Sequence, residues 1–284
     1  MNELIRAQSG ATVVDVAPDG GDWRYTGLTV RRFAAGESAA LPTSGRETLV
    51  VPLAGGARVE VDGDVHTLRG RDAVWEQTDV LYVPAGATAA VTCGLDARIA
   101  FCWAPTEVRH PVQHITPDEV AVELRGAGVC SREVRNFGTP AHLEAERLIV
   151  CEVLTPGGDW SSYPPHKHDR AGTDESELEE IYHYEVAASP SGSPGFALQR
   201  VYASDEREID VAREVRDGDT VLIPYGYHGP TVAAPGHDLY YLNVMAGPGS
   251  GPDRRWLITD DPAHAWIRQT WPELDIDPRL PFRR

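Results

Sequence analysis

The run Tyr-Pro-Pro-His-Lys-His-Asp at residues 163–169 is the stretch from which the fold and the chemistry can be worked out. It follows an apolar, strand-like segment. In an extended chain, residues two apart project to the same face, so His166 and His168 present both imidazoles to one point. Such a pair is a natural metal chelate, although two histidines in a solvated loop would give the same pattern.

A second run, Gly-Asp-Thr-Val-Leu-Ile-Pro-Tyr-Gly-Tyr-His at residues 218–228, supplies a further histidine. Pro224 and Gly226 predict a tight turn that directs His228 inward. Glu180 begins the strand-like run Glu-Ile-Tyr-His-Tyr, where a carboxylate needs a compensating cation. Together with the histidine pair, His228 and Glu180 predict a divalent-metal site built on β-strands.

Short β-rich runs separated by Gly, Pro, Asp and Asn recur along the chain, and sustained helical periodicity is scarce. This pattern predicts an all-β protein. Residues 118–124 are expected to form a short helix in a connection between domains. The tail carries Trp256, Trp266 and Trp271 in a pattern that suits a short amphipathic helix. The predicted strands are residues 28–32, 47–53, 57–61, 80–83, 89–93, 98–103, 147–154, 180–186, 196–202, 220–223 and 239–245.

An internal repeat supports two domains of one type. Residues 79–88 can be aligned with residues 219–228, and Glu47 with Glu180. Thr88 then takes the place of the last histidine, so the first half lacks the metal-binding pattern of the second. We therefore expect a degenerate N-terminal barrel without metal at residues 1–110, a connecting segment at 111–134, a metal-binding barrel at 135–250 and a helical tail at 251–284.

The charge balance excludes several classes of partner. The chain has 26 Lys and Arg against 43 Asp and Glu, a formal charge of −17. This charge repels nucleic-acid phosphates and anionic membrane surfaces, so neither is an expected partner. No stretch approaches the ~18 apolar residues of a spanning helix, and the start MNELIRAQSG lacks the apolar segment of a secretory signal. We expect a soluble cytoplasmic protein whose cysteines, Cys93, Cys102, Cys130 and Cys151, are buried reduced thiols.

The order of these motifs resembles a known family. A His-x-His pair, then a Glu, then a Gly-x5-Pro-x-Gly turn ending near a His looks like the two cupin signatures. The chain more specifically resembles the 5-deoxy-glucuronate isomerase family of inositol catabolism, which is related to the 5-keto-4-deoxyuronate isomerases. The runs that carry this resemblance are YPPHKHD (163–169), LEEIYHY (178–184), GFALQRVY (195–202), DGDTVLIPYGYHGP (217–230), DLYYLNVMAGP (238–248) and GVCSREVRNFG (128–138).

The resemblance implies a bicupin fold and the conversion of 5-deoxy-D-glucuronate to 2-deoxy-5-keto-D-gluconate. One departure from the general cupin pattern is the long spacing of residues 169–179 between the histidine pair and Glu180. We interpret these residues as an inserted acidic loop at the barrel mouth, which could act as a lid. The insertion leaves Glu177 and Glu179 as alternative ligands, and Glu180 is preferred because it adjoins the strand, as in the related uronate isomerases. By strand alternation, His183 faces away from the ligand.

An aldose–ketose isomerisation removes a proton next to a carbonyl and returns it one carbon away. A divalent ion can hold the carbonyl and the adjacent hydroxyl as a Lewis acid, with Zn or Mn expected and Fe, Co or Ni compatible. A general base and a cation for the substrate carboxylate are also required. The candidate catalytic groups are Glu179, Lys167, Tyr182 and Tyr241, and those for substrate binding are Arg200, Tyr225 and Tyr227.

Two functions of other classes remain open from the residues alone. The same ligand set binds iron in cupin dioxygenases, so the fold does not decide the chemistry. A barrel that binds a sugar acid without turning it over is the second alternative. The expected partner in each reading is a small molecule, a sugar acid in the preferred one, and the pattern is compatible with a homo-oligomer.

Overall fold

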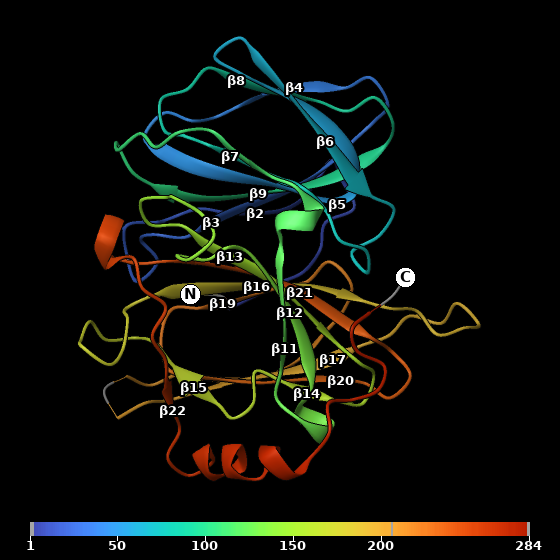
Figure 1. Ribbon diagram of the computed structural model, residues 1–284, viewed down its shortest axis with the longest axis vertical. Coiled ribbons are helices and arrows are strands. Elements are labelled where there is room, and N and C mark those ends of the chain that lie inside the picture. Colours follow the sequence, from blue (N-terminus) through green and yellow to red (C-terminus); the bar gives the residue numbers. More distant parts are fainter. Residues whose placement is uncertain (1–2, 206, 283–284) are drawn as a thin grey trace.

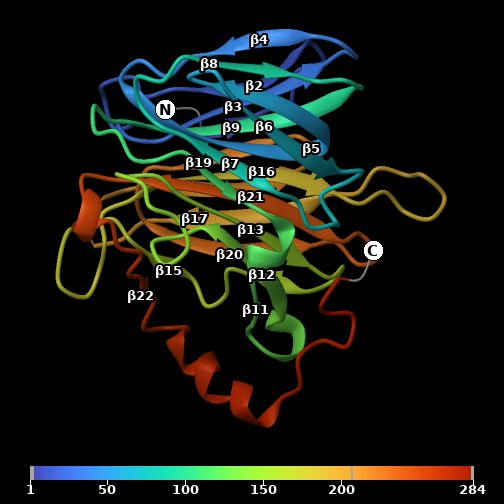
Figure 2. The ribbon, with the colours of Figure 1, turned by 45° about the horizontal axis from the view of Figure 1, so that its top comes forward.

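The computed structural model describes residues 3–205 and 207–282, which are mainly β-strands, so the all-β prediction is confirmed. Layers of sheet are stacked along the long axis, with the N-terminal half above the C-terminal half (Figure 1). Figure 2 shows the same stack from a tilted view, with the C-terminal tail at the far end. No helix among the described residues has the length and apolar character needed to cross a membrane. The helices are 3-10 turns: Pro117–Glu119, Gly128–Cys130, Gly251–Asp253, Ala265–Gln269 and Trp271–Glu273.

The N-terminal half forms one nine-stranded sheet that folds over into two layers. Its central strand, β5 (Arg46–Val61), pairs with β7 and β9 through its first part and with β6 and β8 through its second part. The remaining strands are β2 (Thr12–Val16), β3 (Gly27–Phe33), β4 (Ser38–Leu41), β6 (Asp64–Arg71), β7 (Val80–Val83), β8 (Ala89–Thr92), β9 (Ala97–Pro105) and β10 (Gln113–Ile115).

The C-terminal half contains two sheets that face each other. The seven-stranded sheet has the order β1-β19-β16-β21-β13-β12-β11, and its strand β1 comes from the N-terminal end of the chain. Its strands are β1 (Leu4–Ile5), β11 (Ala121–Arg125), β12 (Arg132–Gly138), β13 (Ile149–Thr155), β16 (Glu179–Val186), β19 (Thr220–Ile223) and β21 (Leu239–Ala246). The six-stranded sheet contains β14 (Trp160–Ser161), β15 (His166–Lys167), β17 (Ala197–Tyr202), β18 (Asp210–Val215), β20 (Tyr227–Ala233) and β22 (Thr259–Asp260).

Three apolar clusters fill the spaces between these layers. One lies inside the N-terminal half and includes Phe33 and Leu81. A second lies between the two C-terminal sheets and includes Tyr184 and Met245. The third joins the halves, because it combines residues of β3 and β5 with residues of β16 and β21, such as Ile181. Strands β16 and β21 at the centre of the seven-stranded sheet are therefore buried along their whole length.

The structure corrects three predicted elements. The strands predicted at residues 47–53 and 57–61 are one strand, β5, with a shift in pairing between Gly55 and Ala57. Gly55 has a φ of 74°, and a Cβ there would lie 2.8 Å from a carbonyl oxygen, so glycine bends the strand without ending it.

The other two corrections concern helices. Residues 118–124 form the end of a 3-10 turn and then β11, which pairs with β12 and so obtains its hydrogen bonds from a neighbouring strand. The tail contains 3-10 turns instead of an amphipathic α-helix, and Pro272 lies at the start of the last turn. All four cysteines are buried and free, as expected.

Two buried carboxylates tie the halves together in the same way. Glu47 of β5 accepts hydrogen bonds from the backbone N–H groups of residues 146–148, at 2.7–2.8 Å. Glu179 of β16 accepts hydrogen bonds from the N–H groups of residues 24–26, at 2.6–3.1 Å. Each carboxylate therefore satisfies three backbone donors of the opposite half, a reciprocal arrangement that we call the carboxylate clamps.

The strand pairing next to the clamps corrects the alignment of the internal repeat. Thr48 pairs with Val83, and Glu180 pairs with Ile223. Because Val83 and Ile223 are equivalent in the repeat, Thr48 takes the place of Glu180, and Glu47 is equivalent to Glu179. The prediction that matched Glu47 with Glu180 is therefore wrong by one residue, which in a strand moves a side chain to the opposite face.

Replacing Glu47 with glutamine tests the clamps. The amide NH2 group of Glu47→Gln would face backbone donors instead of accepting from them, so we expect a loss of about 2–4 kcal/mol in the free energy of unfolding, measured by urea denaturation. Glu60→Gln, an exposed position on the same strand, is the matched control and should change the value by less than about 0.5 kcal/mol. Equal effects of the two substitutions would contradict the role of Glu47.

Candidate metal centre

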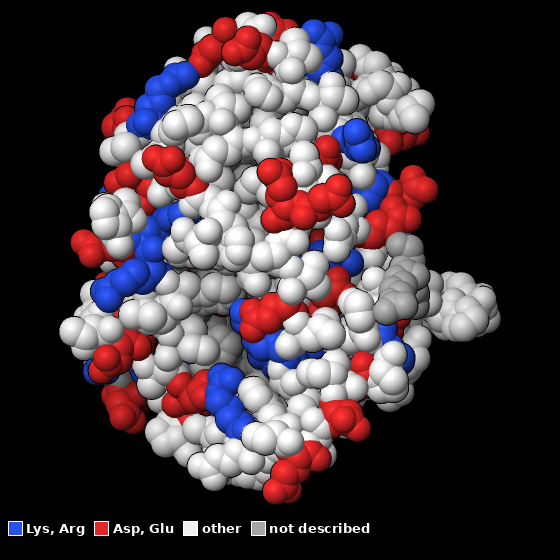
Figure 3. Space-filling view, in the orientation of Figure 1, with Lys and Arg blue, Asp and Glu red and all other residues white. Residues whose placement is uncertain are grey.

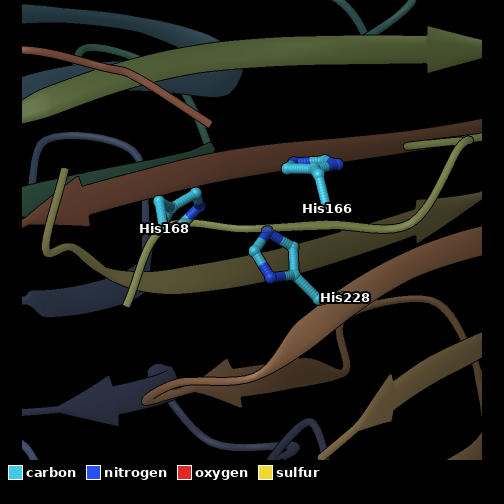
Figure 4. A group of neighbouring side chains, drawn as sticks. All are labelled: His166, His168 and His228. Atoms are coloured by element: carbon cyan, nitrogen blue, oxygen red, sulfur yellow. The ribbon is translucent and has the colours of Figure 1, made fainter. Parts of the chain in front are cut away.

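Facing strands of the C-terminal half bring the predicted histidines together. β15 runs antiparallel to β20, and His166 pairs with His228 across the two strands. His168 directly follows β15, and Glu180 lies on β16 in the opposite sheet. Figure 4 shows the three imidazole rings turned toward one another.

The distances within this group suit shared binding of one ion. One ring nitrogen from each of His166, His168 and His228 lies within 4.8 Å of the others. Oε2 of Glu180 is 3.0 Å from Nε2 of His168 and 3.0 Å from Nε2 of His228. The three histidines could therefore bind a metal ion, and Glu180 is placed to add an oxygen.

Backbone carbonyl groups set the orientation of all three rings. Nδ1 of His166 lies 3.3 Å from the carbonyl oxygen of Pro164, and Nδ1 of His168 lies 3.1 Å from that of Leu178. Nδ1 of His228 lies 3.1 Å from the carbonyl oxygen of Gly226. A carbonyl oxygen can only accept, so each Nδ1–H donates and each Nε2 lone pair is left for a ligand.

Two further observations fit a cation among these groups. Nε2 of His228 is buried, and Oε2 of Glu180 lies 3.0 Å from it. With the ring proton on Nδ1, this nitrogen cannot donate to the carboxylate, so two lone pairs face each other, an arrangement that a cation relieves. Burial alone would raise the pKa of Glu180, but His168 and His228 lower it to about 2. Burial and the other two histidines lower the pKa of His166 well below its usual value. The group therefore contains an ionised carboxylate beside a neutral imidazole, as cation binding requires.

A cavity of about 350 Å³ opens beside the histidine group. This volume is near the lower end of the range of small-molecule sites, about 300–1,000 Å³. Figure 3 shows this face hollowed in its lower half, with basic and acidic side chains around the hollow. The lining includes His166, Glu180, Ser162, Tyr182 and Tyr241, together with Glu123, Arg125, Arg132 and Arg268.

Two tyrosines and a serine form a hydrogen-bonded unit in the cavity wall. The rings of Tyr182 and Tyr241 are stacked, with centroids 4.8 Å apart. Ser162 Oγ lies 2.9 Å from the hydroxyl of Tyr182 and 3.1 Å from that of Tyr241. Ser162 has a φ of 50°, an unusual left-handed conformation for a residue other than glycine. The backbone therefore holds this hydroxyl between the two phenols at a cost in local strain.

Comparison with known proteins identifies the family. Residues 2–267 match the KduI/IolB family. The chain belongs to the KduI/IolB family. A 5-deoxy-glucuronate isomerase from Geobacillus kaustophilus (strain HTA426) is 41% identical over 262 residues, which cover 91% of each chain. That from Bacillus subtilis (strain 168) is 36% identical over 259 residues, which cover 90% of this chain and 92% of the relative. The protein is thus an isomerase of this family, as the sequence runs predicted.

Solved structures support the same family and fold. An IolB-like protein from Salmonella typhimurium LT2 superposes with a TM-score of 0.86 at 38% identity, covering 94% of this chain and 100% of the other. Oxalate decarboxylase from Lactobacillus farciminis superposes with a TM-score of 0.65 at 10% identity, covering 92% and 88%. At this low identity the second likeness shows the fold alone, which is all-β and cupin-like.

The KduI/IolB fold places two of the predicted catalytic residues away from the cavity. Glu179 is used by its carboxylate clamp and faces the N-terminal half, since it alternates with Glu180 along β16. Lys167 alternates with the two histidines beside it, and its Nζ contacts Asp169 at 2.6 Å and Glu175 at 2.8 Å. Burial would lower the pKa of Lys167, but these two carboxylates raise it, so the ammonium cannot serve as a base. Through these two contacts, Lys167 stabilises the inserted acidic loop.

The predicted substrate-binding residues also lie outside the cavity lining. Arg200 is half-exposed and pairs with Asp210 on the neighbouring strand. Tyr225 contacts Arg207, and Tyr227 stacks on the ring of Tyr202. The three side chains are half-exposed and have these other partners, so the structure does not place them in this cavity. His183 is buried and contacts Thr220, facing away from Glu180 as predicted.

Sequence reasoning missed the three arginines of the cavity. Arg125 and Arg132 lie on and at the start of two strands, β11 and β12, in a region interpreted as a connection. Arg268 lies in a 3-10 turn of the tail. The only signal was the run GVCSREVRNFG, which contains Arg132 but shows no periodicity that assigns it a role.

Removal of one histidine tests the metal centre of this isomerase. We expect His228→Ala to weaken metal binding by more than about 100-fold, because it removes a direct donor instead of an outer contact. Elemental analysis of the purified protein and a titration with Mn²⁺ or Zn²⁺ measure the effect. His66→Ala, on β6 in the N-terminal half, is the control and should bind metal as the unsubstituted chain does. Full metal content in His228→Ala would contradict the donor assignment.

Proposed function

We propose that this isomerase converts 5-deoxy-D-glucuronate to 2-deoxy-5-keto-D-gluconate, an aldose–ketose step of myo-inositol catabolism. The observation that carries the proposal is the convergence of His166, His168, Glu180 and His228 beside a cavity that His166 and Glu180 line. The identity of 41% to a 5-deoxy-glucuronate isomerase, over nine-tenths of both chains, supports the substrate. No feature of the described residues favours the dioxygenase or the non-catalytic alternative.

The proposal includes one divalent metal, held by His166, His168, Glu180 and His228. The buried Nε2 of His228, which faces the carboxylate of Glu180 at 3.0 Å, and the outward Nδ1 donors fit such an ion. Zn or Mn is preferred, with Fe, Co or Ni compatible. When bound, it would polarise the substrate carbonyl and stabilise negative charge on oxygen as a Lewis acid. The four side chains fix its position and exclude bulk water, since three of them are almost completely buried.

In this proposal, the unit of Tyr182, Tyr241 and Ser162 donates and accepts protons during the reaction. Burial raises the pKa of Tyr241 to about 12, so its hydroxyl is protonated at neutral pH and can donate to an oxygen that becomes negative. Ser161 and Ser162, 2.6 and 3.1 Å from that hydroxyl, can pass the proton on and return it. Tyr182 extends the chain by its own bond to Ser162. A proton can therefore move along the cavity wall without exchange with bulk water.

The N-terminal barrel has a supporting role in this proposal, and the full architecture is that of a bicupin. Thr48 takes the place of Glu180, and Thr88 that of His228, so this barrel lacks two of the four donors. Glu47 keeps the equivalent of the Glu179 clamp. We therefore retain the division into a degenerate barrel at residues 1–110, a connection at 111–134, a metal-binding barrel at 135–250 and a tail at 251–284.

The function is tested by NMR of 5-deoxy-glucuronate incubated with metal-loaded protein and with a chelated sample. Loss of the aldehyde or hydrate signal and growth of the ketone signal of 2-deoxy-5-keto-gluconate, in the metal-loaded sample alone, is the expected result. An unchanged spectrum at one metal per chain would refute the substrate assignment while leaving the metal centre intact.

Tyr241→Phe tests the proton-handling unit. Loss of the hydroxyl removes the proton donor but keeps the ring stacked on Tyr182, so we expect kcat to fall by about 10²–10⁴-fold with metal content unchanged. Tyr225→Phe, which also removes a hydroxyl but lies outside the cavity, should keep its kcat. A Tyr241→Phe variant with normal kcat would exclude the unit from the reaction.

A further inference from the structure

Arg132 is a buried cation in the cavity wall. It is 7% exposed, and its Nη1 donates to the carbonyl oxygens of Cys130 at 3.0 Å and Tyr163 at 3.3 Å. Tyr163 leads directly into the segment that carries His166, so the guanidinium lies beside the proposed metal ligands. Within residues 3–205 and 207–282, no carboxylate forms an ion pair with Arg132.

Two of the other buried arginines have a carboxylate partner, whereas Arg254 donates to the carbonyl oxygens of Leu143 and Leu148. Arg71 and Arg135, which lie between the halves, both pair with Glu152, at 2.8 and 2.9 Å. This is the usual arrangement, because an unpaired charge in a protein interior is costly. Arg132, unlike Arg254, lines the cavity beside the histidine group, so a negative group that enters this cavity from outside the chain can reach it.

Two further arginines line the cavity, and each already has a carboxylate partner. Arg125 is held by Glu123 at 2.7 Å, and Arg268 is held by Asp260 at 2.8 Å. Burial, with the added repulsion of Arg125 and Arg268, lowers the pKa of Arg132 to about 10. Arg132 is thus still charged at neutral pH, and it is the arginine of the lining that forms no ion pair among the described residues.

We propose that Arg132 binds the carboxylate of a sugar-acid substrate. This inference rests on the proposed function, since it assigns one end of the acid to Arg132 and the carbonyl end to the histidine group. A guanidinium binds a carboxylate through two parallel hydrogen bonds, and the Nε and Nη2 groups of Arg132 donate to no described residue. The cavity is lined by both Arg132 and the ligand residues His166 and Glu180.

The assignment explains how the site would select acids over neutral sugars. A neutral aldose would leave the guanidinium of Arg132 buried and unpaired, whereas a uronate compensates it. Leaving a buried charged group without its partner is a large penalty, so discrimination comes from this one position. Arg200, the arginine predicted for this role, is on the surface and already paired with Asp210.

Metal-loaded Arg132→Gln provides the test, with Arg200→Gln as the matched control. Binding of D-gluconate and D-glucuronate, two six-carbon acids used as probes, is measured by calorimetry, with the neutral sugar D-glucose for comparison. We expect the unsubstituted chain and Arg200→Gln to bind at least one acid, and Arg132→Gln to bind it about 100-fold more weakly, with metal content unchanged. Turnover of 5-deoxy-glucuronate should show the same loss in kcat/KM, mainly through KM.

The outcomes separate this inference from the proposed function. Equal acid binding by Arg132→Gln and the unsubstituted chain, or no acid binding by the unsubstituted chain, overturns the role of Arg132. Acid binding that depends on Arg132, without turnover of 5-deoxy-glucuronate, supports the subsite and refutes the substrate. If Arg132→Gln fails to fold, Arg132→Lys keeps the charge but loses the paired donors, and normal acid binding by that variant also overturns the proposal.

Discussion

The two-residue period of β16 is the constraint on which the rest of this structure depends. Glu180, Tyr182 and Tyr184 point between the C-terminal sheets, where the first two line the cavity. Glu179 and Ile181 point toward the N-terminal half, where one forms a carboxylate clamp and the other packs in the shared core. A single strand thus connects the proposed metal centre to the interface between the halves. A shift of one residue would exchange these two sets and abolish both.

The N-terminal half consequently supports the site through the opposite face of β16. Its backbone donors hold Glu179, and its apolar face covers Ile181, so the strand that presents Glu180 has little freedom to move. No described residue of this half lines the cavity. Its contribution is to support the strand behind the site, because ligands of this kind need packed neighbours that hold them in place.

Much of the site could be predicted from local patterns. The spacing of His166 and His168, the turn before His228 and the apolar run after Glu180 are short-range features, and each gives a direction to a side chain. The substrate-binding residues could not be found in this way. Arg132 and Arg268 are more than a hundred residues apart, and they meet only because β11, β12 and the tail close one side of the barrel.

The sequence by itself determined the all-β class, the family and the three histidines that converge on one point, since these follow from strand alternation and ordered motifs. Tertiary structure alone decided that Glu180 faces the histidines and Glu179 faces the N-terminal half, because the register of β16 depends on its pairing with β19. It also decided that Lys167 and Arg200 are neutralised locally whereas Arg132 is not. Whether a charge is free to bind a ligand depends on which carboxylates lie near it in space, and the order of residues along the chain does not contain that distance.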